Sequence, residues 1–553
     1  MATRRGRTRE QNSSSPSLDS SVSEDTLLDE KYGNQFSRNI WCPKPYTIFK
    51  LLLSTRFCSA FLSNISDCDE TFNYWEPTHY LLYGTGFQTW EYSPQFAIRS
   101  YGYILLNALP GFVQVYLLKA NKVLVFYFLR FVLSIVCAAS ESYFYRQYNF
   151  CCYSGIIKQF GSNVARLAAV FMVFSTGMFI SAAAFLPSSF SMYMVLLSYG
   201  GWFAGHYPVA IVCTAAGSLI GWPFSAVLGA PIAWDVVIRQ RRIGYFIEWC
   251  VISLIAIMGP LVYVDSHYYG KVVITPFNIV MYNVFGKGGP ELYGVEPWTF
   301  YFVNGLLNFN IVFVLALLVL PVWVSIKKCA DASLPIKLFQ YGKAQCSDGA
   351  GFVKLVVNEK HERKFPTSSL PVWLPIVGMY IWIAIFFTRP HKEERFLYPI
   401  YPLFVLFGAL SVSEVQKLYH HLFTRTTKQH FSESSTWLAI VISVVYVLLS
   451  LSRSSALFYG YHAPLDLYLE FNHMTDSIDT YVSPKQKQIN VCVGKEWHRF
   501  PGSFFLPSDR WRLQFIESDF RAQLPKPYGP GGNATYVIPT DMNDRNEEER
   551  SRY

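Results

Sequence analysis

Charge is scarce in this sequence of 553 residues: only 15% are Asp, Glu, Lys or Arg, whereas 51% are apolar and 17% are aromatic. Soluble enzymes of this length carry more charge, so the composition is typical of an integral membrane protein. The formal net charge of +9 is spread over many loops instead of one basic face, which excludes nucleic acid as a partner.

The sequence also lacks the cysteine spacing of a disulfide framework or a zinc site. Most of its 11 cysteines stand singly in apolar runs, where a small hydrophobic side chain is the ordinary role. No Walker phosphate loop, Rossmann glycine pattern or metal-ligand cluster is present. We therefore expect no cofactor and no metal, and we find no pattern that would hold a nucleotide-sugar donor.

A cleavable signal peptide is missing as well. Residues 1–40 begin with arginines and continue through a stretch of Ser, Asp and Glu. Such a composition cannot bury a core, so we expect a disordered cytosolic tail, with the first hydrophobic segment acting as an uncleaved signal anchor.

What the sequence does contain is a series of apolar runs of about 20 residues, the length that spans a bilayer. The run at 207–237 is interrupted by Pro and Gly, so it is either one broken helix or two. The first run is weakened by Lys50 and Arg56. We predict an all-α polytopic membrane protein with about eleven transmembrane helices, at 45–63, 101–118, 122–143, 164–181, 183–204, 207–237, 243–265, 300–326, 371–388, 399–418 and 437–458.

The positions of the cations predict the orientation of these helices. Basic residues precede the first helix and follow the sixth, eighth and tenth, so these loops face the cytosol by the positive-inside rule. The stretch 144–161, which contains Arg146 and Lys158, then falls on the luminal side and is a mild exception. The other segments predicted to be luminal are 64–100, 266–299, 389–398 and 459–553.

Two glycosylation sequons agree with this orientation, because Asn64 and Asn533 both fall in predicted luminal segments. A third sequon, at Asn12, faces the cytosol and should be unused. After residue 458, aromatic residues spaced among polar ones are typical of a small folded luminal domain. The predicted domains are a tail (1–40), a transmembrane domain with its first luminal loop at 64–100 (41–458) and a C-terminal luminal domain (459–553).

The first luminal loop combines acidic and aromatic side chains. Carboxylates accept hydroxyl protons and aromatic faces stack on sugar rings, so we expect Tyr74, Trp75 and Glu76 to contact a sugar. Asp69 and Glu70 are adjacent, and partial burial with like-charge repulsion would raise one pKa into the range of a general base. The alternatives are an interfacial aromatic belt with solvated acids and, for any one acid, a structural salt bridge.

A late luminal loop carries the complementary charges. His391, Lys392 and Arg395 can neutralise a phosphate while neighbouring glutamates orient them, and a short loop holds these cations against the bilayer surface. The alternative is that the cations merely flank helices. The Gly-rich stretch 286–298 is read as a flexible lid or acceptor-contacting loop through Tyr293, Glu296 and Trp298, with a plain connecting loop as the alternative.

These strings carry a family resemblance, which covers residues 40–550. It rests on Asp67–Tyr80, Phe87–Pro94, Ile98–Tyr101, Tyr293–Trp298 and His391–Phe396. Together they resemble the membrane mannosyltransferases that use dolichyl-phosphate-mannose, and most closely the alpha-1,2-mannosyltransferases of lipid-linked oligosaccharide assembly.

The resemblance implies a GT-C glycosyltransferase fold in the endoplasmic reticulum membrane. It further implies inverting transfer from dolichyl-phosphate-mannose to a dolichyl-diphosphate oligosaccharide, adding the seventh and ninth mannoses for protein N-glycosylation. In that family the acidic pair supplies the base, here Asp69 with Glu70 beside it, and the string from His391 to Phe396 is a signature.

The chemistry agrees with this expectation, because cations at His391, Lys392, Arg395 and Arg99 would offset the charge that develops on a phosphate leaving group. A bound metal is then not required. Two rivals remain: a sibling mannosyltransferase that forms alpha-1,6 linkages or builds a glycolipid anchor, and a multi-pass lipid transporter. A transporter should place its ionisable groups near mid-bilayer on broken helices, whereas here they gather in luminal loops.

Overall fold

The computed structural model describes residues 42–286, 294–333, 370–423, 430–481, 488–520 and 523–537, except 146, 150, 151 and 532, and also Met542 and Arg545. From Pro43 on, the described residues form one compact unit. The predicted tail at 1–40, the Asn12 sequon and Tyr293 lie outside the described residues.

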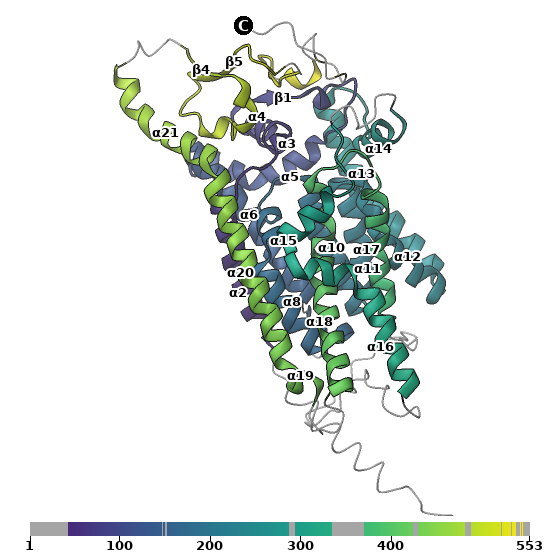
Figure 1. Ribbon diagram of the computed structural model, residues 1–553. Coiled ribbons are helices and arrows are strands. Elements are labelled where there is room, and N and C mark those ends of the chain that lie inside the picture. Colours follow the sequence, from purple (N-terminus) through teal and green to yellow (C-terminus); the bar gives the residue numbers. More distant parts are fainter. Residues whose placement is uncertain are drawn as a thin grey trace, which may run out of the picture. The chain divides into compact units, whose positions relative to one another are not determined.

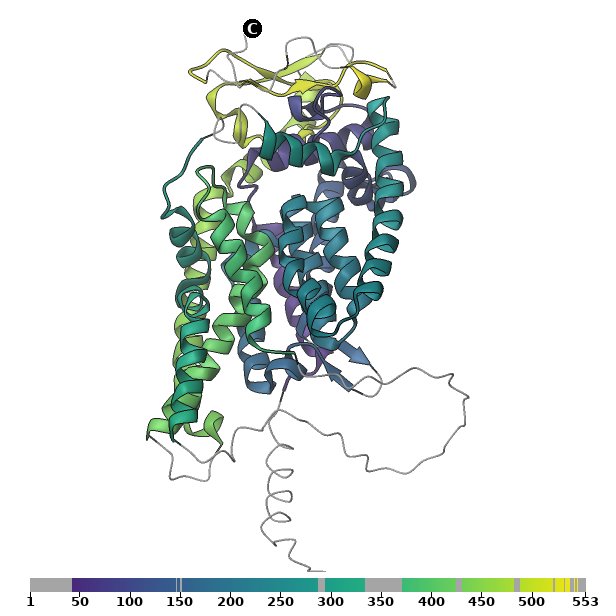
Figure 2. The same cartoon turned by 90° about the vertical axis from the view of Figure 1, so that its right-hand side faces the viewer.

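Helices make up most of this unit, as the sequence predicts (Figures 1 and 2). Within the described residues, five are long and apolar enough to cross a membrane: Lys122–Tyr145, Ile243–Tyr269, Phe300–Ile326, Glu394–Phe423 and Thr436–Tyr461. The helices that build the bundle are α2 (Pro45–Leu62), α6 (Lys122–Tyr145), α8 (Ser162–Phe174), α9 (Thr176–Ser181), α10 (Pro187–Ala204), α11 (Tyr207–Ala216), α12 (Ala230–Trp234), α13 (Ile243–Tyr269), α15 (Phe300–Leu317), α16 (Val319–Ser333), α17 (Trp373–Phe386), α18 (Tyr401–Phe423) and α20 (Thr436–Tyr461).

Helices α2 and α6 pack against each other in opposite directions. Arg130 of α6 donates to the Ser63 carbonyl just beyond α2 at 2.7 Å, and Tyr145 at the other end of α6 reaches the carbonyl of Pro43 at 3.4 Å. Between these ends, Arg56 pairs with Glu141 at 2.6 Å, and both side chains are fully buried. This pairing explains how α2 tolerates a charge inside an apolar run.

The antiparallel packing corrects the prediction of a membrane-spanning helix at 101–118. Because α2 ends and α6 begins at the same end of the pair, the chain between them does not cross to the other end. Residues 101–117 form α5 (Tyr101–Phe112) and η3 (Val113–Leu117), with Leu109, Val113 and Tyr116 more than half exposed. An apolar run indicates contact with lipid, but it does not show that a helix crosses the membrane. A helix that lies along the membrane surface also carries apolar side chains on its lipid-facing side.

The run at 207–237 forms two segments, which is one of the two expected alternatives. Helix α11 continues through η4 (Gly217–Gly221) and stops at Trp222, whose backbone is extended. The chain then returns through η5 (Pro223–Gly229), α12 and η6 (Asp235–Arg239). The return is complete at Gln240, whose side chain donates to the Tyr207 hydroxyl at 2.6 Å.

These two departures offset each other, so residues from 243 on keep the side that the sequence predicts. Between these two departures each connection changes sides: the turn before α6 and the segment around Phe185 lie with the first loop, while the stretch after α6 and the turn between α10 and α11 lie at the other end. The hairpin of β2 (Gln147–Asn149) and β3 (Cys152–Ser154) lies at the end where α2 begins, seen as blue arrows near the lower end of Figure 2. The basic stretch 144–161 therefore sits with the other basic loops and is no longer an exception to the positive-inside rule.

A layer of loops, short helices and strands covers the other end of the bundle (Figure 1). Strand β1 (Phe87–Gln88) of the first loop pairs with β6 (Lys526–Pro527) of the C-terminal segment, and β4 (Ile489–Val493) runs parallel to β5 (Trp511–Phe515). The two regions share one hydrophobic core, made of Phe72, Phe87, Phe500, Leu506, Trp511 and Leu513. The C-terminal domain expected from the sequence is thus continuous with the first loop.

Candidate functional site

The first loop turns sharply at the short helix α3 (Cys68–Glu70), which continues into η1 (Thr71–Trp75) and α4 (Glu76–Tyr83). Asp67 is the N-cap: one of its carboxylate oxygens accepts the backbone N–H of Asp69 at 2.9 Å. Acidic residues favour this position because the first N–H groups of a helix lack partners. The cap fixes the backbone from which the Asp69 side chain projects.

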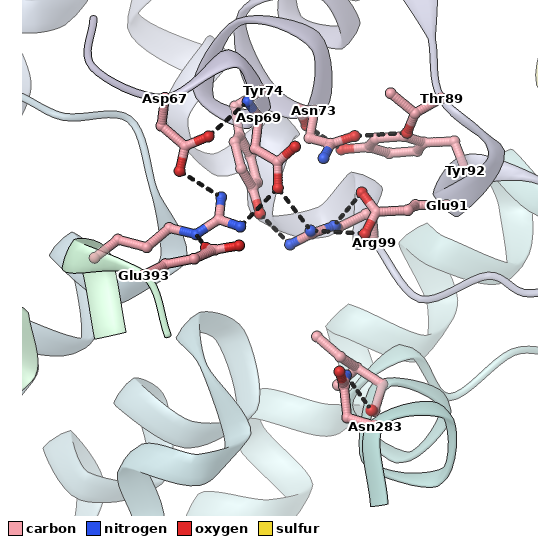
Figure 3. A network of polar contacts seen from close by, with 12 residues as sticks. Asp67, Asp69, Asn73, Tyr74, Thr89, Glu91, Tyr92, Arg99, Asn283 and Glu393 are labelled. Carbon is pink, nitrogen blue, oxygen red and sulfur yellow. Dashed lines mark hydrogen bonds and ion pairs between the residues drawn. The ribbon is translucent and has the colours of Figure 1, made fainter. Parts of the chain in front are cut away.

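Arg395 brings the two ionic strings together across 326 residues of sequence. It lies in η9 (Glu394–Ile400), directly before α18. Its guanidinium contacts Asp69 at 2.7 Å and Asp67 at 2.9 Å, and its Nε pairs with Glu393. Acids and cations predicted from separate loops therefore meet in one network (Figure 3).

A second arginine approaches Asp69 from the other side. Arg99 forms a two-pronged pair with Glu91, at 3.0 and 2.8 Å, and donates to the Tyr74 hydroxyl at 2.6 Å. The Nη2 atom that pairs with Glu91 also lies 3.7 Å from the Asp69 oxygen that binds Arg395. Figure 3 shows Arg99 between Glu91 and Asp69.

One carboxylate oxygen of this network stays available. Asp67, Glu91 and Glu393 each use both oxygens in contacts within the network or with His391. Asp69 uses only Oδ2, and no contact to Oδ1 is found among the described residues. The Asp69 side chain is also 33% exposed, which is more than any other acid in the network. The arrangement therefore offers one accessible proton acceptor held between two guanidinium groups.

Glu70 points away from this network although it is next to Asp69. Glu70 is 2% exposed. Its Oε1 atom accepts the indole N–H of Trp75 and the backbone N–H of Phe185, both at 3.0 Å. Burial raises the pKa of Glu70 above its ordinary value, although Arg130 and these hydrogen bonds oppose the shift. Glu70 ties α3 to the chain before α10 and presents no surface to a substrate.

The positions of Trp75 and Glu76 do not fit the predicted sugar contacts, because both residues are fully buried. The Trp75 ring packs against Phe126, 4.4 Å between centroids. Glu76 accepts the backbone N–H of Phe87 at 2.9 Å and the Ser503 hydroxyl at 2.9 Å, so it joins the first loop to the C-terminal segment. Burial raises the pKa of Glu76 to about 7, with the hydrogen bonds opposing the shift. Both side chains are buried beneath the first loop and stabilise it.

Of the four predicted phosphate-binding cations, His391 and Lys392 lie outside the network around Asp69. The Lys392 ammonium donates to the carbonyl of Glu296 at 2.9 Å, and its residue is 6% exposed. His391 contacts the carbonyl of Gly294 at 2.9 Å and the Glu393 carboxylate at 3.1 Å. Burial works against ionisation of His391, but these two acceptors raise its pKa. Burial also opposes ionisation of Glu393, but the charges of Arg395 and His391 hold the pKa of this carboxyl below its ordinary value.

The remaining predicted residues are spread around this end of the molecule. Glu296 is exposed and Trp298 is 71% exposed, with the indole against Phe302 at 5.7 Å between ring centroids. Asn64 is half-buried three residues before Asp67, and Asn533 is exposed in the C-terminal segment.

Asp67 and Glu91 were not among the predicted site residues, whereas Glu393 is one of the neighbouring glutamates expected to orient the cations, and it pairs with Arg395 and His391. Asp67 carries a usable signal, because an Asp two residues before another acid at a loop-to-helix junction is a typical N-cap. Glu91 carries none, since the sequence gives no indication of which acid Arg99 will meet.

Asp67, Cys68 and Asp69 also place possible metal ligands within 4.8 Å of one another. Both carboxylates already pair with Arg395, whose guanidinium supplies positive charge at that point. Burial and the two neighbouring acids raise the pKa of the Cys68 thiol. A metal ion at this point would compete with Arg395 for both carboxylates.

The chain is similar to known proteins over most of its length. Residues 47–507 match the Alg9-like mannosyltransferase family. Alpha-1,2-mannosyltransferase ALG9 of Homo sapiens is 51% identical over 524 residues, which is 95% of this chain and 79% of the human protein. The Drosophila melanogaster protein of the same name is 41% identical over 92% of this chain and 76% of its own length.

Among solved structures, the crystal structure of ArnT from Cupriavidus metallidurans bound to undecaprenyl phosphate is similar with a TM-score of 0.50. The similarity covers 89% of this chain and 87% of that one, at 11% sequence identity. At this identity the likeness shows the fold alone, and it confirms the GT-C fold expected from the sequence.

Proposed function

Because this chain belongs to the Alg9-like mannosyltransferase family, we propose that it transfers mannose from dolichyl-phosphate-mannose to a dolichyl-diphosphate-linked oligosaccharide in alpha-1,2 linkage. The observation that carries the proposal is the 51% identity to a protein named alpha-1,2-mannosyltransferase over 95% of the chain. The proposed products carry the seventh and ninth mannoses of the lipid-linked oligosaccharide that serves protein N-glycosylation.

The network suggests how the transfer proceeds. The Oδ1 atom of Asp69 takes the proton from the acceptor hydroxyl as that oxygen bonds to the anomeric carbon of mannose. The bond between this carbon and the phosphate oxygen breaks on the opposite face, so the configuration inverts and dolichyl phosphate leaves. Arg395 and Arg99 stand beside Asp69, where their charges offset the negative charge that grows on the leaving phosphate.

We place the reaction at the luminal face of the endoplasmic reticulum membrane. The support is the positive-inside rule, which now holds for the 144–161 stretch as well, and the position of Asp69 at the opposite end of the bundle. Both proposed substrates are membrane lipids, which agrees with a site at the end of a bundle of apolar helices.

The test is a linkage determination with defined substrates. The protein, purified into nanodiscs, receives labelled dolichyl-phosphate-mannose and acceptors that carry five, six, seven or eight mannoses. We expect label only on the six- and eight-mannose acceptors, and its complete release by a mannosidase specific for alpha-1,2 linkages. Label that resists this enzyme, or transfer only to a glycolipid-anchor precursor, would contradict the proposal. Asp69→Asn protein in the same nanodiscs serves as the inactive control.

A further inference from the structure

The contacts of His391 and Lys392 point to a role that the sequence did not suggest. Both side chains reach from the loop before η9 to the segment 294–297, which precedes α15. The two segments are also joined through their backbones, because the N–H of Glu296 donates to the carbonyl of Pro390 at 3.0 Å. Three contacts thus fasten one loop to the other.

The Lys392 ammonium is used mainly for this purpose. It donates to the carbonyl of Glu296 at 2.9 Å and, more weakly, to that of Pro390 at 3.4 Å. No carboxylate of the described residues lies within ion-pair distance of it. A buried ammonium held by two backbone carbonyls fixes the relative position of the chains that carry them, since releasing it would leave charge and carbonyls unpaired.

His391 extends the same connection toward the catalytic network. One ring nitrogen faces the carbonyl of Gly294 and the other faces Glu393, so the ring satisfies both acceptors when both nitrogens carry protons. Glu393 in turn pairs with Arg395, which binds Asp69. A continuous series of contacts therefore runs from the segment 294–297 to the proposed base.

We infer that Lys392 and His391 are positioning residues, which dock the segment 294–297 and hold the Glu393–Arg395–Asp69 series in register, and that neither binds the donor phosphate. This inference rests on the proposed function for its kinetic part, while its structural part is independent of any activity. The phosphate-contacting cations are then Arg395 and Arg99, which lie beside Asp69.

The experiment compares Lys392→Met, which keeps the side-chain length but removes the donors, with Lys392→Arg, which keeps donors. Lys495→Met is the matched control, because Lys495 is 69% exposed in the C-terminal segment and pairs only loosely with Asp519 at 3.8 Å. Hydrogen exchange of peptides covering 294–299 is followed by mass spectrometry on full-length protein in nanodiscs, without substrate. Donor KM, acceptor KM and kcat are then measured.

In Lys392→Met we expect exchange at 294–299 to become about tenfold to a hundredfold faster, the effect of losing one hydrogen bond to a charged group. Lys392→Arg and Lys495→Met should exchange as the unmodified protein does. The kcat of Lys392→Met should fall at least about tenfold while donor KM changes less than about threefold, as for lost orientation of the base. His391→Gln should show the same pattern more weakly.

The inference is overturned if exchange at 294–299 is unchanged in Lys392→Met, or if donor KM rises with kcat intact, because that would identify a phosphate ligand. If Lys392→Met fails to fold, the comparison moves to His391→Gln alone, with the same readouts and the same criteria. Failure of the proposed function would appear differently, as a lack of mannose transfer by the unmodified protein, and would leave the exchange result standing.

Discussion

At the scale of single residues, the choice between Asp69 and Glu70 depends on the direction of two adjacent side chains. Asp69 is 33% exposed with one oxygen free, whereas Glu70 is 2% exposed and holds Trp75 and Phe185. The sequence shows only that two acids are neighbours. Their environments separate because successive residues of a helical turn project about 100° apart.

This difference predicts opposite consequences for two matched substitutions. Asp69→Asn should lower kcat by about 10²- to 10⁴-fold, the usual contribution of a positioned base, with the thermal midpoint nearly unchanged. Glu70→Gln should keep most turnover per folded molecule but lower the thermal midpoint, because it disturbs a buried acceptor. Single-turnover rates and melting curves in nanodiscs measure both. A catalytically dead, thermally normal Glu70→Gln would reverse the assignment.

Glu76 predicts a pH dependence of stability. Its pKa is raised to about 7 in the folded protein from an ordinary value of 4.5, because burial penalises the charged form. The unfolded chain releases this proton first, so folding is most favoured at low pH and loses stability as the pH rises between these two values. Above about pH 7 the loss is complete.

The measurement is the thermal midpoint at pH 6 and pH 8, for the unmodified protein and for Glu76→Gln. The unmodified protein should be more stable at pH 6, and the substitution, which cannot ionise, should reduce that difference. Equal pH slopes in the two proteins would show that Glu76 is already ionised when folded. Asp519→Asn, at an exposed position, is the control for a charge change of the same size.

At the scale of elements, helix α13 sets the position of Arg99 without contacting the charged network. Its Tyr269 hydroxyl donates to the backbone carbonyl of Arg99 at 2.6 Å. Its Asp265 accepts the Ser100 hydroxyl at 2.9 Å and the backbone N–H of Gly102 at 2.8 Å. The segment that carries Arg99 is therefore held at two points, the backbone carbonyl of Arg99 and the start of α5.

We predict that Asp265→Ala raises donor KM by about tenfold, through misplacement of Arg99, since a charge-assisted hydrogen bond contributes about 1.5–3 kcal/mol. Tyr269→Phe, which removes one hydroxyl, should act in the same direction and more weakly. Donor titrations of the purified variants check both. If Asp265→Ala bound donor normally, α13 would not determine the position of Arg99.

The elements also show where sequence patterns succeed and where they fail. Apolar length identified α6, α13 and α20 because burial in lipid requires it along the whole helix. The same criterion misassigned 101–118, since α5 and η3 expose apolar side chains without crossing. It left 207–237 undecided, because the reversal at Trp222 is made by backbone geometry and not by a change in polarity.

At the scale of the whole molecule, the antiparallel packing of α2 and α6 places the β2–β3 hairpin and the first loop at opposite ends. We predict that an epitope inserted after Asn149 is reached by antibody from the cytosolic side of intact microsomes. A glycosylation sequon inserted after Leu118 should be glycosylated, because the chain there lies with the first loop. An inaccessible epitope together with an unglycosylated sequon would support a membrane-spanning helix at 101–118 and contradict our assignment of the two ends to cytosol and lumen.

Local composition was enough to predict the membrane class, the helical fold and the family, because burial in lipid requires apolar runs and the family resemblance rests on continuous strings of residues. It also predicted Asp69, Arg99 and Arg395 as site residues, and these three side chains lie together in the structure. Three features became visible only in the folded chain: Asp69 is the acid that faces the arginines, Trp75 and Glu76 are buried beneath the first loop, and Lys392 reaches backbone carbonyls. These outcomes depend on contacts across as many as 427 residues, and side-chain direction is set by packing partners that no local pattern contains.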